Sequence, residues 1–158
     1  MAIDPRTVIG HVHLTVSDLE RALAFYRDVL GFEVSARYGR DAVFLSAGGY
    51  HHHIGLNTWA GRGAPPPAPG TTGLYHFAVL YADRRALVAA VRRVVEQGVP
   101  LEGAADHGVS EAVYLRDPDG NGIELYRDRP RDEWPRDGGG GLVMQTGPLD
   151  VAALLRET

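Results

Sequence analysis

One glutamate of this chain lies where it could either take part in chemistry or simply face solvent. The run from Tyr114 to Tyr126 is typical of two short strands joined by a turn, because Asp117-Pro118-Asp119-Gly120 has the residue types of a type I turn. After the turn, Ile123 and Leu125 alternate with Glu124, so the apolar pair and the carboxylate face opposite sides. A carboxylate in a short apolar strand is costly to bury unless positive charge lies opposite it. The pattern fits either a metal ligand or an exposed glutamate on an edge hairpin.

Two of the seven histidines stand at matched positions of an internal repeat. The segments His11-Val-His-Leu-Thr-Val-Ser-Asp18 and His76-Phe-Ala-Val-Leu-Tyr-Ala-Asp83 align without a gap. In the first segment, strand alternation places His11 and His13 on one face, and Val12, Leu14 and Val16 on the face that a following helix would cover. A repeat of this kind predicts two modules related by pseudo-symmetry.

The repeat predicts a metal site. If the sheets of the two modules curve together, His11, His76 and Glu124 line one concavity. Two imidazoles and one carboxylate form a facial triad that suits Fe(II) or another divalent ion and leaves open positions for ligands. A single histidine is more often structural than a ligand, but matched positions in a repeat favour metal binding.

The elements that would position these residues follow the order β-α-β-β-β twice. In the first module we expect a helix that begins at Ser17, with Glu20 completing a capping box, and ends at Gly31. In the second, Asp83 caps a helix that ends at Gly98. The expected strands are Val8 to Val16, Phe32 to Tyr38, Ala42 to Ala47, Tyr50 to Asn57, Leu74 to Tyr81, Val99 to Glu102, Glu111 to Leu115 and Gly122 to Arg127.

The domain organisation follows from these elements. Residues 8–60 form module 1, residues 61–73 a Pro/Gly-rich linker, residues 74–127 module 2 and residues 128–158 a C-terminal tail. In the tail we expect a flexible stretch at Gly138 to Gly141, and a short amphipathic helix from Leu149 to Leu155 that docks on the body or on a partner subunit. The predicted fold class is α+β, with two paired modules forming a cupped mixed β-sheet around a metal.

Composition excludes several classes of site and partner. The 158 residues carry 16 basic and 20 acidic side chains with no basic stripe, so we expect neither a nucleic acid nor a membrane partner. The absence of cysteine excludes disulfides and thiolate ligands, so a metal must be held by nitrogen and oxygen. With no leader sequence and no apolar run of membrane length, we expect a cytoplasmic protein.

The residues quoted above carry a resemblance to a known family. The run from Ile9 to Asp18, with Phe25-Tyr26, Leu30-Gly31-Phe32 and Asp117-Pro-Asp-Gly followed by Ile-Glu-Leu125, resembles the vicinal oxygen chelate superfamily. That superfamily includes glyoxalase I, extradiol catechol dioxygenases, thiol transferases of fosfomycin resistance and bleomycin-binding proteins. The resemblance implies paired βαβββ modules around one metal, with ligands at His11, His76 and Glu124.

Three further matches resemble the extradiol dioxygenases, and the segment from Asp106 to Pro135 is most similar to small catechol 2,3-dioxygenase-like proteins. His52-His53 resembles a histidine pair whose second member acts as acid and base. Tyr114 stands at the place of a tyrosine that helps deprotonate catechol, and His107 at that of a supporting histidine. The resemblance thus implies a non-haem Fe(II) extradiol dioxygenase that cleaves a catechol-like aromatic ring, with His53, Tyr114 and His107 as catalytic residues.

Two departures leave alternatives open. The larger extradiol enzymes have four modules and this chain has two. The site is therefore built either within one chain or across two chains, and we expect the protein to form a homodimer. His53 also falls near a carboxylate ligand of glyoxalase I and could be a fourth ligand. The alternative functions are a lyase, isomerase or thiol transferase that uses Mn, Ni or Zn, and a resistance protein that binds a small molecule without catalysis.

Overall fold

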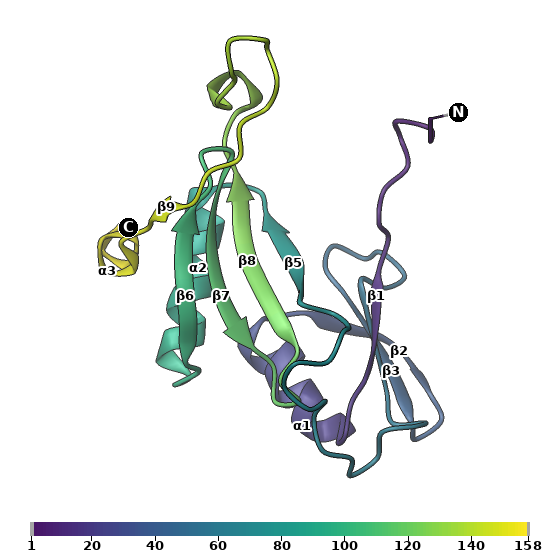
Figure 1. The fold of residues 1–158 in the computed structure, drawn as a ribbon. Helices are drawn as coiled ribbons and strands as arrows, with labels where there is room; N and C mark the ends of the chain where they lie inside the picture. The colour runs from purple at the N-terminus through teal and green to yellow at the C-terminus, as the bar shows by residue number, and fades with distance from the viewer. Residues whose placement is uncertain (1, 158) are drawn as a thin grey trace. The chain divides into compact units, whose positions relative to one another are not determined.

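Each half of the chain folds around a sheet whose first and last strands pair in parallel (Figure 1). The computed structural model describes residues 2–157 and divides into two units, unit 1 (Met1–Pro65) and unit 2 (Pro66–Thr158). The division falls within the Pro/Gly-rich segment 61–73. In both units the order strand, helix and three strands confirms the predicted repeat and the α+β fold class.

Unit 1 contains a four-stranded mixed sheet in the order β1-β4-β3-β2. Strands β1 and β4 are parallel, with Val12 opposite Ile54, whereas β4, β3 and β2 are antiparallel. Its elements are β1 (Val12–Thr15), α1 (Leu19–Leu23), the π-helical η1 (Ala24–Val29), β2 (Glu33–Tyr38), β3 (Ala42–Ser46) and β4 (Ile54–Asn57).

The helix of unit 1 begins one residue later than predicted. Asp18, and not Ser17, is the N-cap, because its carboxylate accepts the main-chain N–H of Arg21 at 2.8 Å. The helix widens into η1, which ends at Val29 with Leu30 as its C-cap, and Gly31 follows with a φ of 86° that only glycine adopts without strain. Leu14 and Val16 are buried, as the alternation predicted.

Unit 2 contains a five-stranded mixed sheet in the order β5-β8-β7-β6-β9. Strands β5 and β8 are parallel, with Phe77 opposite Ile123, and the other pairs are antiparallel. Its elements are β5 (His76–Tyr81), α2 (Arg84–Glu96), β6 (Leu101–Asp106), β7 (Ser110–Arg116), β8 (Gly122–Asp128), η2 (Arg131–Glu133), β9 (Gly147–Pro148) and α3 (Val151–Arg156).

Helix α2 covers one face of this sheet, and that packing forms the core of unit 2 (Figure 1). Asp83 caps the helix through the main-chain N–H of Ala86, as predicted. Ile123 and Leu125 of β8 point to the covered face and are fully buried. Because side chains alternate along a strand, Glu124 lies on the opposite, uncovered face.

The first strand and the glycine-rich tail also differ from the sequence prediction. The first strand begins at Val12 and not at Val8, because its parallel partner begins at Ile54 and leaves residues 8–11 without a ladder. The four glycines of the tail form a turn in which Asp137 accepts the N–H groups of Gly139 and Gly141. The predicted terminal helix is present as α3, and it docks on α2 through the buried Leu154.

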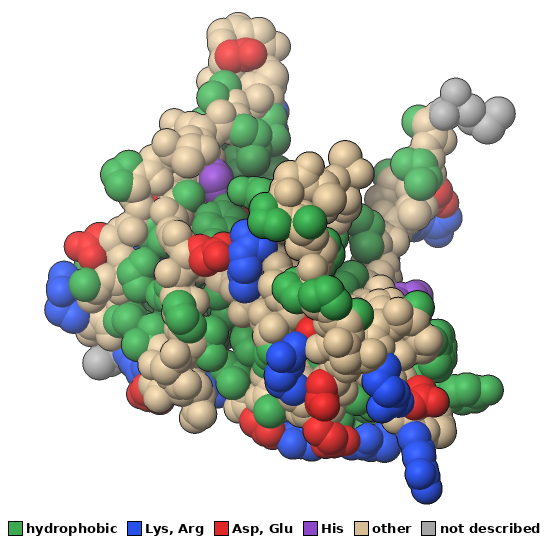
Figure 2. Space-filling model, turned by 60° about the horizontal axis from the view of Figure 1, so that its bottom comes forward, with side chains coloured by type: hydrophobic (Ala, Val, Ile, Leu, Met, Phe, Trp, Pro, Cys, Tyr) green, Lys and Arg blue, Asp and Glu red, His purple; other side chains and the backbone are tan. Residues whose placement is uncertain are grey.

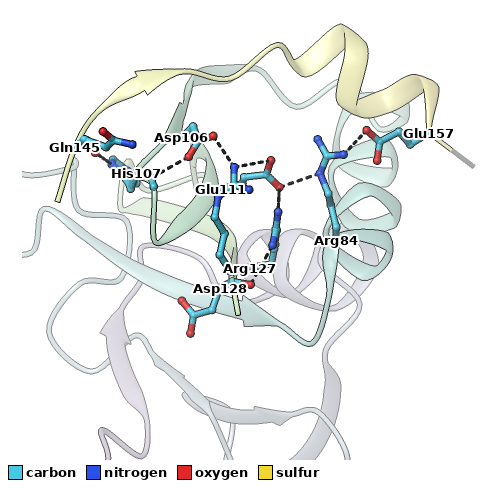
Figure 3. A network of polar contacts seen from close by, with 10 residues as sticks. Arg84, Asp106, His107, Glu111, Arg127, Asp128, Gln145 and Glu157 are labelled. Carbon is cyan, nitrogen blue, oxygen red and sulfur yellow. Dashed lines mark hydrogen bonds and ion pairs between the residues drawn. The ribbon is translucent and has the colours of Figure 1, made fainter. Parts of the chain in front are cut away.

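A buried carboxylate on the helix-covered face of the unit 2 sheet is linked to the first residue of α2 (Figure 3). Glu111 of β7 is 4% exposed and accepts hydrogen bonds from Arg84 at 2.9 Å and from Arg127 at 2.8 Å. Arg129 lies 3.4 Å from its second oxygen and also pairs with Asp106 at 2.5 Å. One buried charge thus links β7, β8, α2 and the segment after β8.

Charges at the surface are mixed. On the face in Figure 2, basic and acidic side chains are interspersed, and neither sign forms a continuous stripe. No helix within residues 2–157 has the length and apolar character needed to cross a membrane. The absence of a nucleic acid or membrane partner and the cytoplasmic location stay predictions.

Removing the charge of Glu111 should unfold unit 2 more readily. We expect Glu111→Gln to lower the free energy of unfolding by about 3–5 kcal/mol, because three guanidinium groups lose a buried partner. Glu102→Gln is the matched control, because Glu102 pairs with Arg116 at 2.7 Å but both side chains are about half exposed. Such an exposed pair contributes roughly 0–1 kcal/mol. Urea unfolding of both variants measures the difference, and equal losses would contradict the structural role of Glu111.

Candidate metal and proton-transfer site

His76 and Glu124 converge on the uncovered face of the unit 2 sheet. The register pairs Ala78 with Glu124, which puts His76 and Glu124 on the same face of two parallel strands. His76 Nε2 lies 3.0 Å from Glu124 Oε2, and these side chains are 31% and 12% exposed. Gly122 allows β8 to approach the main chain before His76 closely, because a Cβ at that position would lie 2.1 Å from the carbonyl oxygen of Tyr75. Two of the three predicted ligands are therefore adjacent.

Tyr114 and His107 extend this pair into a chain of polar contacts. Tyr114 of β7 stands directly opposite Glu124 in the antiparallel ladder. Its hydroxyl lies 3.4 Å from Glu124 Oε1 and 2.7 Å from His107 Nε2. The Nδ1 of His107 lies 2.8 Å from the main-chain oxygen of Gln145. Both predicted catalytic residues of unit 2 thus connect to the predicted ligands.

The electrostatics of this cluster keep Tyr114 protonated. Burial is the main cause that raises the pKa of Tyr114 to about 12, and the negative charge of Glu124 adds to it. In the metal-free protein the hydroxyl is therefore a hydrogen-bond donor at neutral pH.

In unit 1, His11 is an exposed residue immediately before β1, and His13 has a packing role. His13 lies over Gly55, where a Cβ would come within 2.9 Å of its ring. Phe44 and Trp59 flank the ring of His13 with centroids 5.8 Å away. The ring of His13 therefore packs between aromatic side chains and over Gly55.

The three successive histidines lie differently from the prediction. They precede β4, which begins at Ile54, so strand alternation does not govern His51 and His53. His52 contacts the ring of His11 with a centroid distance of 4.3 Å, and burial is the main cause that lowers its pKa. His53 Nδ1 accepts the N–H of Ala47 at 3.2 Å, so neutral His53 carries its proton on Nε2.

The internal repeat shows which residue of unit 1 corresponds to Glu124. With His11 aligned to His76, the registers of β1 with β4 and of β5 with β8 equate Ile54 with Ile123. Gly55 is then the counterpart of Glu124, and His53 is the counterpart of Gly122. Unit 1 thus offers a histidine but no carboxylate at the repeated positions.

The donor set fits a divalent metal in part. His76 and Glu124 place a nitrogen and an oxygen side by side on an accessible face, which suits Fe(II), Mn(II) or Zn(II). Within residues 2–157, no group of three histidine, aspartate or glutamate side chains is arranged to hold an ion. His11 belongs to unit 1 and the other two to unit 2, so the triad stays a prediction.

Two residues of the site were missed in the sequence. His52 had no assigned role, yet it contacts His11. Gln145 contributes through its main-chain carbonyl, and no side-chain pattern signals such a contact.

Comparison with known proteins identifies the family. The model of the glyoxalase/bleomycin resistance protein/dioxygenase superfamily matches residues 8–125. The chain is 46% identical over 156 residues to a catechol-2,3-dioxygenase of Bacillus subtilis (strain 168), covering 99% of this chain and 54% of that protein. It is 33% identical to biphenyl-2,3-diol 1,2-dioxygenase 3 of Rhodococcus globerulus, covering 81% of this chain and 66% of that one. The chain therefore spans less than two thirds of each of these relatives.

Among solved structures, that of a lactoylglutathione lyase from Agrobacterium tumefaciens has a similar fold. It superposes with a TM-score of 0.60 at 29% identity, covering 78% of this chain and 95% of the lyase. Sequence and structure thus agree, and this chain belongs to the glyoxalase/bleomycin resistance protein/dioxygenase superfamily.

Proposed function

We propose that this chain carries the active site of a metal-dependent extradiol-type dioxygenase that opens a catechol-like aromatic ring. The observation that carries the proposal is the contact chain from His76 through Glu124 and Tyr114 to His107. It sets a pair of metal donors beside a hydroxyl and an imidazole that can move a proton. The 46% identity to a catechol-2,3-dioxygenase supports the same reaction class.

In this proposal His11, His76 and Glu124 hold one divalent ion, most simply Fe(II). The bound metal would supply Lewis-acid activation of the two adjacent substrate oxygens and electron exchange with dioxygen. Gly55, the counterpart of Glu124, has no side chain to contribute, which favours three protein ligands over four and leaves room for substrate.

The protein's own residues would divide the proton transfers. A catechol hydroxyl that approaches Glu124 comes within reach of the Tyr114 oxygen, which can take its proton if Tyr114 passes its own to His107 Nε2. His53 has its proton on Nε2 and would act first as a donor. The uncovered sheet face, with Ala78 and the 55% exposed Leu80, offers apolar surface to an aromatic ring.

A non-oxidative metal enzyme is the second candidate. The likeness to a lactoylglutathione lyase supports it, because such chemistry also acts on adjacent oxygens of a small substrate. The lack of a carboxylate at Gly55 counts against a four-ligand version of this site.

The proposal also includes a homodimer, in which a second copy of the chain could complete the metal site.

Metal binding should depend on the predicted ligands. We expect His76→Ala and Glu124→Gln to lose bound Fe(II), because each removes one of two adjacent donors. His51→Ala is the matched control, since His51 is exposed and lies outside the proposed ligand set. Metal content after anaerobic loading and gel filtration measures this. Retention of a full equivalent of iron by Glu124→Gln would rule out the proposed ligand set.

Oxygen uptake tests the reaction class. Protein loaded anaerobically with Fe(II) should consume oxygen with substituted catechols and give a yellow ring-opened product. Parallel samples loaded with Mn, Ni or Zn test the alternative metals, and lyase assays test the alternative reaction. No uptake with iron or manganese across the panel would transfer the assignment to the non-oxidative enzymes.

Replacing His53 separates a proton donor from a ligand. We expect His53→Ala to keep its iron and to lose roughly 10²–10⁴-fold in kcat, as general acid–base groups do. Iron content and oxygen uptake are measured on the same sample, with His51→Ala again as control. Loss of iron from His53→Ala would make His53 a ligand and favour glyoxalase-like chemistry.

A further inference from the structure

The C-terminal segment lies beyond residues 8–125, which the family model matches, yet it is integrated into unit 2. Strand β9 extends the sheet at β6, with Gly147 opposite Asp106. Helix α3 packs on α2, where Arg92 donates to the carbonyl oxygen of Leu155 at 2.9 Å. Arg84 also pairs with Glu157 (Figure 3). The segment is thus anchored on unit 2 at β9, at α3 and at Glu157.

Immediately before β9 the segment contacts the predicted catalytic histidine (Figure 3). The carbonyl oxygen of Gln145 lies 2.8 Å from His107 Nδ1, and the N–H of Gln145 donates to the carbonyl oxygen of His107 at 3.4 Å. The side chain of Gln145 packs over Gly108, where a Cβ would lie 2.7 Å from Gln145 Nε2 and 2.8 Å from Pro135 Cγ. Gly108 therefore lets the segment approach closely.

This contact determines which ring nitrogen of His107 carries the proton. A main-chain carbonyl can only accept a hydrogen bond, so the contact requires a proton on Nδ1. In the neutral imidazole Nε2 is then bare and can only accept. The group 2.7 Å from Nε2 is the Tyr114 hydroxyl, which therefore donates its hydrogen to His107.

We propose that the C-terminal segment is a positioning element of the active site: the Gln145 carbonyl holds His107 with its proton on Nδ1, so that Nε2 accepts the Tyr114 proton. The proposal rests on the dioxygenase function proposed above and assigns a role to residues outside the family domain. His107 acts here through Tyr114 and is itself positioned by Gln145.

The proton movements balance without a further reactant. As a substrate hydroxyl gives its proton to the Tyr114 oxygen, the O–H bond of Tyr114 breaks and its proton forms a bond to His107 Nε2. Tyr114 stays neutral, the substrate becomes an anion, and His107 becomes an imidazolium whose Nδ1–H remains on the Gln145 carbonyl. The transfer from Tyr114 to His107 requires a bare Nε2 at the start, and the contact of Nδ1 with the Gln145 carbonyl provides it.

The test is the tautomer of His107, observed by two-bond nitrogen–proton NMR on the metal-free, histidine-labelled full chain at pH 8. We expect a protonated Nδ1 and a bare Nε2. Tyr114→Phe should keep this tautomer, because the carbonyl and not the hydroxyl selects it. Gly108→Ala should shift the population toward protonated Nε2, because the new methyl group displaces Gln145 and Pro135.

Gly140→Ala is the matched control for Gly108→Ala. Both glycines have positive φ, 82° and 73°, but a Cβ at Gly140 meets nothing within 4 Å. It should keep the wild-type tautomer. In the iron-loaded enzyme, Gly108→Ala should lower kcat on the order of 10²-fold with a smaller change in KM, as misplaced catalytic groups do, and Gly140→Ala should not.

The outcomes separate this proposal from the proposed function. A protonated Nε2 or a doubly protonated ring in the wild type overturns the proposal, and so does a tautomer that switches in Tyr114→Phe or stays unchanged in Gly108→Ala. If the tautomers are as expected but the iron-loaded protein consumes no oxygen, the positioning of His107 by Gln145 is upheld. Only the dioxygenase assignment is then refuted.

Discussion

The parallel pairing of first and last strands is the constraint on which the candidate site depends. In unit 2 it fixes the register of β5 on β8, so that His76 and Glu124 share the uncovered face and their side chains meet. A shift by one residue would send Glu124 into the apolar layer under α2 and expose Ile123, which is fully buried. Core packing and ligand placement therefore stabilise the same register, and the site needs no separate device to hold it.

The same pairing in unit 1 gives a different result because two residues differ. There His13 fills the space over Gly55, whereas in unit 2 Glu124 stands opposite the small Ala78. A bulky residue on one strand thus accompanies a small one on its neighbour in both units, with the strands exchanged. As a result, unit 1 has the ring of His13 packed against Phe44 and Trp59 where unit 2 has the carboxylate of Glu124.

Sequence patterns predicted the parts of the structure that depend on side-chain periodicity. The alternation of Ile123, Glu124 and Leu125 and the caps at Asp83 and Gly31 were enough to place two modules and one face of unit 2. The errors arose where a partner strand or a main-chain group decides the structure. The first strand starts at Val12 because its partner strand β4 starts at Ile54, which pairs with Val12. His51 to His53 lie before β4, so the two-residue alternation of a strand cannot predict which way their side chains face.

The role of Gln145 shows why the rest of the site escapes such patterns. A carbonyl is present at every residue, so only the path of the chain selects the one that meets His107. That path is determined outside the site, by the buried Leu154 of α3, which packs on α2, by β9 on β6 and by Glu157 on Arg84. Arg84 in turn binds Glu111, which faces the opposite side of β7 from Tyr114. The buried charge network and the proton-transfer cluster therefore share β7 as a common support. If the charge network on one face of β7 is weakened, the strand that carries Tyr114 loses part of its support. Replacing Glu111 should therefore disturb the proton-transfer cluster although Glu111 has no contact with it.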